Sequence, residues 1–174
     1  DPSRPSLVNV TLTVPASDGK PRKLFLRGVQ WGLKPQVVNP RCRSGPLKRS
    51  APGEWVLPAS CARIDWTVPF KTPAPATVNV SEQASLFFRS PGWWLLSEPT
   101  SLLRLEGDSQ ASSLQLQGVK APVRQVGATS VRKGVWRVPP TNNAPEFYTF
   151  GNVAHTTETV GTLTVQYVAD NSTL

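Results

Sequence analysis

The chain has 174 residues, of which 39% are hydrophobic and 17% charged, and its formal net charge is +8. Eighteen prolines are spread along the whole length, and each interior proline costs a helix about 3 kcal/mol. This composition excludes an acidic tail and a charge-rich helical protein, and it favours an all-β protein.

The predicted elements are short strands separated by turns. Ser6–Val14 alternates imperfectly between apolar and polar residues and predicts a first strand. The turn residues at positions 16–21 predict that Lys23–Val29 returns as the second arm of a hairpin, whereas Asn39–Gly53, rich in Arg, Ser, Pro and Gly, is predicted to be a loop. Further strands are predicted at Trp31–Val38, Glu54–Leu57, Cys61–Phe70, Thr77–Val80, Leu86–Arg89, Trp93–Ser97, Ser101–Glu106, Ser113–Gln117, Val131–Val138, Glu146–Phe150, Val153–Glu158 and Leu163–Val168.

This pattern of many short strands is typical of an antiparallel β-sandwich with few or no helices. No segment repeats, and no composition shift marks a boundary, so residues 1–174 are expected to form a single domain. The chain begins at Asp1 without a methionine and finishes on a polar stretch, Asp170–Leu174. We therefore expect it to be the N-terminal part of a longer exported protein from which an upstream signal segment is missing.

The two cysteines, Cys42 and Cys61, lie nineteen positions apart. A zinc site needs four ligands, and a redox site usually has a CxxC motif; this chain has one histidine and no CxxC. Two alternatives remain, a pair of free thiols or one disulfide. The even cysteine count and the low Lys and Glu content favour the disulfide, and with it a periplasmic or secreted protein. No apolar run approaches the length of a membrane span.

A basic stretch lies between Asp18 and Glu54, which enclose nine positive residues and no acidic one. Such a stretch could bind an acidic polymer or glycan, with Arg41, Arg43, Lys48 and Arg49 as the contacts. The alternative is a solvated face whose charges protect strand edges from unwanted pairing. No nucleic-acid-binding motif is readable in the sequence, so nucleic acid is not an expected partner.

Two adjacent tryptophans, Trp93 and Trp94, lie in an apolar segment. Neighbouring residues of a strand point to opposite faces, so at most one of them enters a given core face. The other is a candidate for an interface with a partner domain or for stacking on a sugar ring. The alternative is that both are buried, by loops or by a second sheet.

Catalytic signals are absent from the sequence. His155 is the only histidine, it lies in a predicted strand without a GxSxG partner motif, and the acidic residues have no informative spacing. Phosphate-binding glycine loops are also missing. We therefore expect no enzyme activity, no catalytic or metal-binding residue and no cofactor. Three N-glycosylation sequons, at Asn9, Asn79 and Asn171, matter only if the source organism glycosylates.

The order of several motifs gives a resemblance to a known family. The motifs are a strand ending in Val-Pro at Val14–Pro15, a Trp-Gly pair at Trp31–Gly32, the segment Cys61–Val68 and the aromatic segment Pro91–Leu96. The chain resembles the N-terminal β-domain that precedes the thermolysin-like domain of bacterial glycyl-aminopeptidase-like (gluzincin) metallopeptidases. The resemblance implies a β-sandwich that packs on a catalytic domain C-terminal to it. The family's HExxH zinc motif does not occur in this sequence, so no catalytic residue is carried over.

Overall fold

A computed structural model of the chain describes residues 7–15, 17–69, 93–107, 112–117, 124–126, 129–132, 135–139, 147–151 and 153–170. Within these ranges the protein is built almost entirely of antiparallel strands, with one 3-10 turn, η1 (Arg27–Trp31), and one four-residue helix, α2 (Glu98–Ser101). The predicted all-β fold class is confirmed. No described helix has the length and apolar character needed to cross a membrane.

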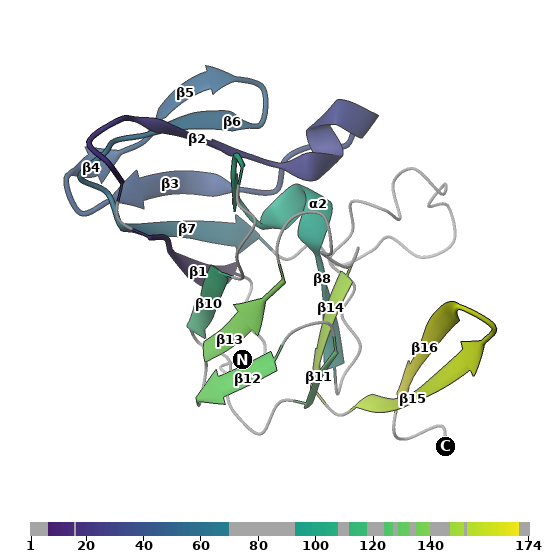
Figure 1. Ribbon diagram of the computed structural model, residues 1–174. Coiled ribbons are helices and arrows are strands. Elements are labelled where there is room, and N and C mark those ends of the chain that lie inside the picture. The colour runs from purple at the N-terminus through teal and green to yellow at the C-terminus, as the bar shows by residue number, and fades with distance from the viewer. Residues whose placement is uncertain are drawn as a thin grey trace.

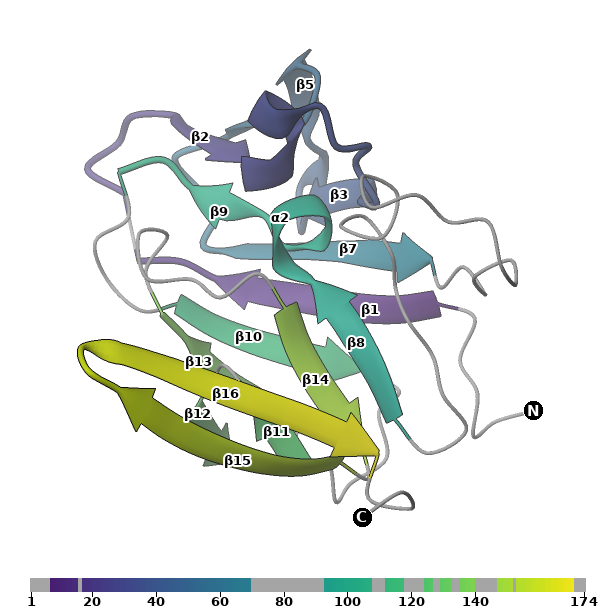
Figure 2. The same cartoon turned by 90° about the vertical axis from the view of Figure 1, so that its right-hand side faces the viewer.

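The largest element is a seven-stranded sheet (Figures 1 and 2). Its neighbouring strands are antiparallel throughout. In spatial order it contains β12 (Thr129–Arg132), β13 (Val135–Val138), β10 (Ser112–Gln117), β1 (Leu7–Thr13), β7 (Arg63–Pro69), β3 (Val38–Cys42) and β4 (Gly45–Pro46).

Two smaller sheets form the facing layer, and α2 lies between them (Figure 1). The four-stranded sheet contains β5 (Lys48–Ala51), β6 (Glu54–Leu57), β2 (Arg22–Phe25) and β9 (Arg104–Leu105). The three-stranded sheet contains β11 (Arg124–Val126), β14 (Phe147–Gly151) and β8 (Trp93–Ser97). A separate hairpin, β15 (Val153–Val160) and β16 (Leu163–Asp170), follows β14.

The core lies between these layers, because strand alternation directs every second side chain of β1 and β7 inward. Ile64, Trp66 and Val68 of β7 are all at most 3% exposed, and Val10 and Leu12 of β1 belong to the same cluster. Leu24 and Leu57 contribute from the four-stranded sheet, and Leu96 and Tyr148 from the three-stranded sheet. The inward positions predicted for Cys61, Ile64, Trp66 and Val68 are confirmed.

Several predicted pairings are wrong. The first strand does not form a hairpin with the second, because β1 pairs with β7 and β10, whereas β2 pairs with β6 and β9. The segment predicted as one strand at Val131–Val138 belongs to two strands, β12 and β13, which pair with each other. Ser101–Glu106 is mostly not a strand, since only Arg104–Leu105 is extended and paired.

The basic segment Asn39–Gly53 is also not a loop. It contributes most of β3 and all of β4 and β5, at the ends of two sheets where proline is tolerated and charged side chains face solvent. The strand predicted at Trp31–Val38 is wrong, because η1 ends at Trp31 and β3 begins only at Val38. The turn between β5 and β6 needs Gly53, whose φ is +70° and whose added Cβ would meet Val29 at 2.4 Å.

The strands predicted at Thr77–Val80 and Leu86–Arg89 lie outside the described residues, as do the sequons at Asn79 and Asn171. The other predicted strands occur close to their expected positions. The hairpin predicted around positions 159–162 is present, with all eight residues of β15 paired to β16.

Candidate functional site

Cys42 and Cys61 form a disulfide, with their Cα atoms 6.0 Å apart. Both residues are buried, at 4% and 5% exposure. The bridge joins the end of β3 to the segment that leads into β7, so it holds two strands that are already neighbours in the seven-stranded sheet. The predicted disulfide is thus confirmed.

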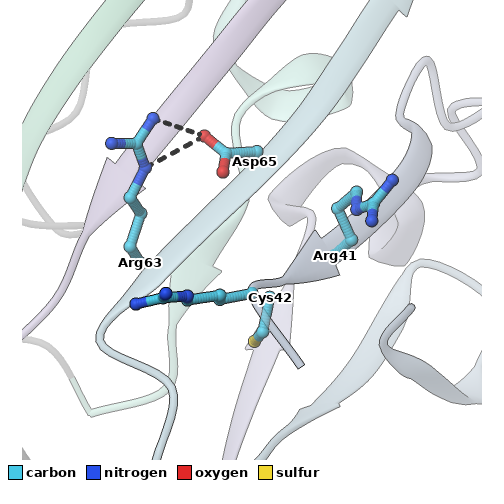
Figure 3. Close-up of a pocket in the computed structure, with 5 residues that line it drawn as sticks. Arg41, Cys42, Arg63 and Asp65 are labelled. Atoms are coloured by element: carbon cyan, nitrogen blue, oxygen red, sulfur yellow. Dashed lines mark hydrogen bonds and ion pairs between the residues drawn. The ribbon is translucent and has the colours of Figure 1, made fainter. Parts of the chain in front are cut away.

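Three arginines lie near Cys42 of this disulfide, on the outer face of the sheet (Figure 3). Arg41, Arg43 and Arg63 line an open hollow of about 530 Å³ together with Asp65. Arg63 donates from Nε and Nη2 to Asp65 Oδ1 at 3.3 and 3.2 Å. Arg41 lies directly opposite Asp65 in the register between β3 and β7. Among these three arginines, Arg63 is the one that contacts the carboxylate of Asp65.

Lys48 and Arg49, predicted to act with Arg41 and Arg43, belong to β5 in the other layer. Both are exposed. The Arg49 guanidinium lies 6.0 Å from the centre of the Trp55 ring and donates from Nε to the Ala51 carbonyl oxygen at 3.2 Å. The structure thus brings Arg41 and Arg43 together with Arg63, a residue that the sequence did not single out. Arg63 lies within the predicted strand at Cys61–Phe70, but its position beside Arg41 follows from a long-range strand pairing.

The other residues that the sequence singled out, two tryptophans and a histidine, lie on β8 and β15. Trp93 and Trp94 begin β8, where their backbone pairs with Gly151 and Phe150 of β14, and their side chains lie outside the description. His155 is exposed on β15. In the part of the chain that the structure describes, no three His, Cys, Asp or Glu side chains come close enough to hold a metal ion.

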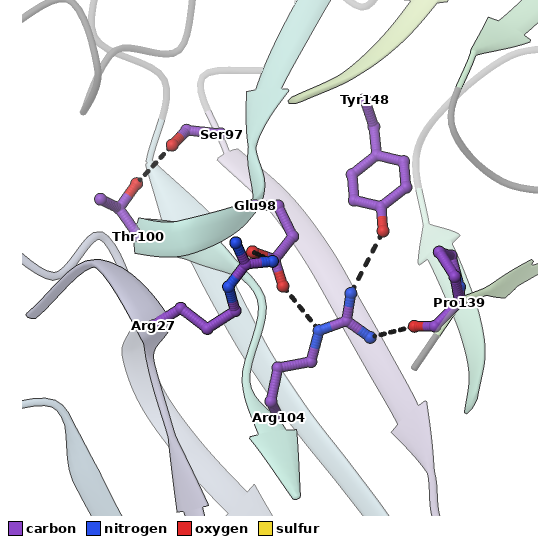
Figure 4. A network of polar contacts seen from close by, with 7 residues as sticks. All are labelled: Arg27, Ser97, Glu98, Thr100, Arg104, Pro139 and Tyr148. Atoms are coloured by element: carbon purple, nitrogen blue, oxygen red, sulfur yellow. Dashed lines mark hydrogen bonds and ion pairs between the residues drawn. The ribbon is translucent and has the colours of Figure 1, made fainter. Parts of the chain in front are cut away.

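A buried charged network crosses the centre of the molecule (Figure 4). Glu98 is 0% exposed and Arg104 is 2% exposed, and Arg104 Nε donates to Glu98 Oε1 at 2.6 Å. A second arginine, Arg27 of η1, lies with Nη1 3.2 Å from Glu98 Oε2. Arg104 also donates to the Pro139 carbonyl oxygen at 3.0 Å and to Tyr148 Oη at 3.2 Å. The network therefore links both smaller sheets through α2.

The backbone of α2 is tied to the seven-stranded sheet in the same region. Trp66 Nε1 of β7 donates to the Ser101 carbonyl oxygen at 2.9 Å. The backbone N–H of Gln36, two residues before β3, donates to the Thr100 carbonyl oxygen at 2.8 Å. These bonds satisfy carbonyl groups at the end of a helix too short to satisfy them itself. The buried polar residues here thus have a structural role, which the sequence spacing of Glu98 and Arg104 did not reveal.

Burial raises the pKa of Tyr148 from 10.0 to about 12. Between these values the folded protein keeps a proton that the unfolded chain has lost, so stability falls as the pH rises. We expect the contribution of Tyr148 to the free energy of unfolding to be constant below about pH 9 and to fall by up to about 3 kcal/mol by about pH 12. Urea unfolding followed by tryptophan fluorescence measures this loss.

The matched variant is Tyr148→Phe, which should have a flatter alkaline profile. This variant should still lose some stability as the pH rises. A hydrogen bond to Glu106 raises the pKa of the Lys23 ammonium, and the folded protein loses the stabilising charge of Lys23 as the pH rises past that pKa. Equal slopes for the wild type and Tyr148→Phe between about pH 10 and pH 12 would contradict the assignment.

The β15–β16 hairpin has an exposed apolar face. Val160 pairs with Leu163, and by strand alternation Val165 and Tyr167 lie on the same face. Val160, Leu163 and Tyr167 are 60%, 63% and 51% exposed. On the opposite face of β15, His155, Thr157 and Thr159 are exposed as well, whereas Val153 at the start of the strand is buried. In Figure 1 the hairpin projects from the two packed layers.

No protein-family model matches the chain, and a comparison with curated protein sequences gives no match. Its fold is similar to the crystal structure of an aminopeptidase N family protein from Idiomarina loihiensis, with a TM-score of 0.57 at 14% sequence identity. The likeness covers 94% of this chain and 30% of that protein. At this identity the likeness is one of fold, and the chain spans less than a third of the length of its neighbour.

Proposed function

We propose that the chain is a non-catalytic accessory domain of an exported bacterial metallopeptidase-like protein and that it packs on a catalytic domain that follows it. The observation that carries the proposal is the extent of the structural likeness, which includes nearly all of this chain but only 30% of the aminopeptidase N family neighbour. The sequence motifs from Val14–Pro15 to Pro91–Leu96 resemble an N-terminal domain of such peptidases, which supports the same conclusion.

The β15–β16 hairpin is the part of this domain best suited to docking. A two-stranded hairpin on its own is marginally stable in water, because it lacks a covered face. Here Val160, Leu163 and Tyr167 form an exposed apolar face on two strands that pair only with each other in the described sheets. A partner domain would bury this face and stabilise the hairpin. Trp93 and Trp94 in the edge strand β8 are a second candidate contact.

Export is supported by the disulfide between Cys42 and Cys61. Disulfides of this structural kind persist in the periplasm and outside the cell, whereas reducing systems oppose them in the cytosol. A periplasmic or secreted location agrees with this chemistry. Mass spectrometry of the protein isolated from its native host, alkylated before any reduction, should find both cysteines unalkylated. Quantitative alkylation would contradict export.

Hydrogen–deuterium exchange tests the docking role. We expect the amides of residues 155–168 to exchange rapidly in the 174-residue chain and at least about tenfold more slowly in the intact gene product, because docking suppresses opening of the hairpin. Residues 63–69 of the central β7 serve as the internal control and should be equally protected in both. Identical exchange of the hairpin in the two proteins would refute its role as the docking element.

A double substitution separates docking from folding. Leu163→Ser with Tyr167→Ser should change the free energy of unfolding of the 174-residue chain by less than about 0.5 kcal/mol per site, since both residues are half exposed or more. In the intact gene product the same variant should lose the slow exchange of residues 155–168. The matched control is Thr157→Ala with Thr159→Ala on the opposite face, which should retain the slow exchange. If both double variants lost the slow exchange equally, a role for the apolar face would be contradicted.

A further inference from the structure

A furrow runs along the outer face of the seven-stranded sheet, away from the hairpin residues discussed above. Three open hollows on this face overlap in the residues that line them. The central one is lined by Arg41, Arg43, Arg63 and Asp65; it shares Arg41, Arg63 and Asp65 with a hollow of about 420 Å³ that reaches Asn9 and Thr67. On its other side it shares Arg43 and Arg63 with a hollow of about 500 Å³ that reaches Ser60. Each hollow is within the size range of known ligand sites.

Positive charge in this furrow exceeds the negative charge that could neutralise it. Asp65 Oδ1 accepts hydrogen bonds from Arg63 and from Thr11. The side chains of Arg41 and Arg43 have no ion-pair partner among the described residues. Both are exposed, and Arg41 is held by strand pairing directly across from Asp65. Two guanidinium groups are therefore available to pair with the anionic groups of a ligand.

Neutral polar groups continue the furrow beyond the arginines. Thr67 Oγ1 donates to Asn9 Oδ1 at 3.2 Å, which places a hydroxyl and an amide side by side on β7 and β1. Such groups exchange hydrogen bonds readily with the hydroxyls of a sugar. The described aromatic residue at the furrow, Trp66, is 3% exposed and belongs to the core, so it offers no stacking surface of the kind that single-stranded nucleic acids use.

We propose that this furrow binds a linear acidic polysaccharide, whose carboxylate or sulfate groups pair with Arg41 and Arg43 and whose hydroxyls lie along Asn9 and Thr67. The Cys42–Cys61 disulfide is part of the site, because Cys42 lies between the two arginines and Cys61 lies two residues before Arg63. The bridge thus fixes the spacing of the cationic groups on the two strands. This site is independent of the domain's docking role.

Titration calorimetry with oligosaccharides of heparin, which carry sulfate, and of alginate, which carry only carboxylate, tests the proposal and distinguishes the two anionic groups. We expect the 174-residue chain to bind at least one of them at low salt, to lose affinity as salt is added, and not to bind neutral dextran. Arg41→Gln with Arg43→Gln should raise the Kd about tenfold, since two exposed ion pairs are lost. Reduction of the disulfide should also weaken binding.

The matched control is Lys34→Gln with Lys48→Gln, which removes the same charge from exposed sites outside the furrow. It should change the Kd less than about twofold if the furrow is the site. Equal weakening by the two double variants would overturn the proposal, because it would show attraction to the net charge alone. Failure to bind either acidic oligosaccharide, or tighter binding of single-stranded DNA through the same arginines, would also overturn it.

Discussion

Replacement of Glu98 by alanine is expected to lower the free energy of unfolding by about 3–5 kcal/mol. Glu98 is fully buried, and its two carboxylate oxygens face Arg104 at 2.6 Å and Arg27 at 3.2 Å. Removal of the carboxylate would leave two guanidinium groups in the interior without their counter-ion, which is the costly way to break a buried ion pair. Urea unfolding at neutral pH, followed by circular dichroism, measures the loss.

Glu98→Gln is the companion variant for the case in which Glu98→Ala does not fold. It keeps the shape and one hydrogen-bond acceptor but removes the charge, so its loss should be smaller than that of alanine. Glu106→Ala provides the control, because Glu106 also pairs with a cation, Lys23, but its side chain is 59% exposed; an exposed pair of this kind contributes at most about 1 kcal/mol. Equal costs for Glu98→Ala and Glu106→Ala would contradict a stabilising role for the network.

Loss of the disulfide is expected to lower the free energy of unfolding by about 3 kcal/mol. Cys42 and Cys61 close a loop with a sequence separation of 19, which contains β4, β5 and β6. Without the bridge the unfolded chain gains the conformational freedom of this loop, and the folded state is correspondingly less favoured. Comparison of urea unfolding for the oxidised protein and for the protein reduced with a phosphine measures the difference.

Cys42→Ala with Cys61→Ala distinguishes the bridge from side effects of the reductant. Both cysteines are buried, and alanine introduces no new polar group at either position. The double variant should match the reduced protein to within about 1 kcal/mol, and the reductant should have no effect on it. A reduced protein as stable as the oxidised one would show that the strand pairing alone holds this region.

Local patterns predicted the strands that alternate clearly. Cys61–Phe70 and Leu163–Val168 have period-two apolar residues, and that period is a property of the segment itself. The segment Glu54–Leu57 agrees residue for residue with β6. The division of Val131–Val138 between β12 and β13, by contrast, was not predicted, because the valines and the tryptophan of this segment suit a strand on either side of the division.

Which strands pair with one another could not be predicted from local patterns. The register between β1 and β7 places Thr11 opposite Asp65, more than fifty residues away, and nothing local to either strand specifies that pairing. For the same reason the sequence singled out Arg41 and Arg43 but not Arg63, which joins them only after β3 and β7 pair. The Glu98–Arg104–Tyr148 network likewise exists only once three segments pack together.

The prolines and basic residues of Asn39–Gly53 misled the prediction for a physical reason. Turn-forming composition usually indicates a loop, but edge strands accept proline and charge because one side of their backbone faces solvent. The buried residues of this segment are Pro40, Cys42, Leu47 and Gly53, whereas its arginines and Lys48 are exposed. Burial of so few residues gives little apolar periodicity for a sequence pattern to detect.

The most direct test of the proposed function is the protein sequence encoded beyond residue 174. An accessory domain of a metallopeptidase-like protein predicts a downstream domain with an HExxH motif and a further glutamate that complete a zinc site. Sequencing of the messenger RNA from the native source, with intact-mass measurement of the isolated protein, gives the answer. A natural polypeptide that ends near residue 174, or that continues into a domain without peptidase character, would contradict the proposal.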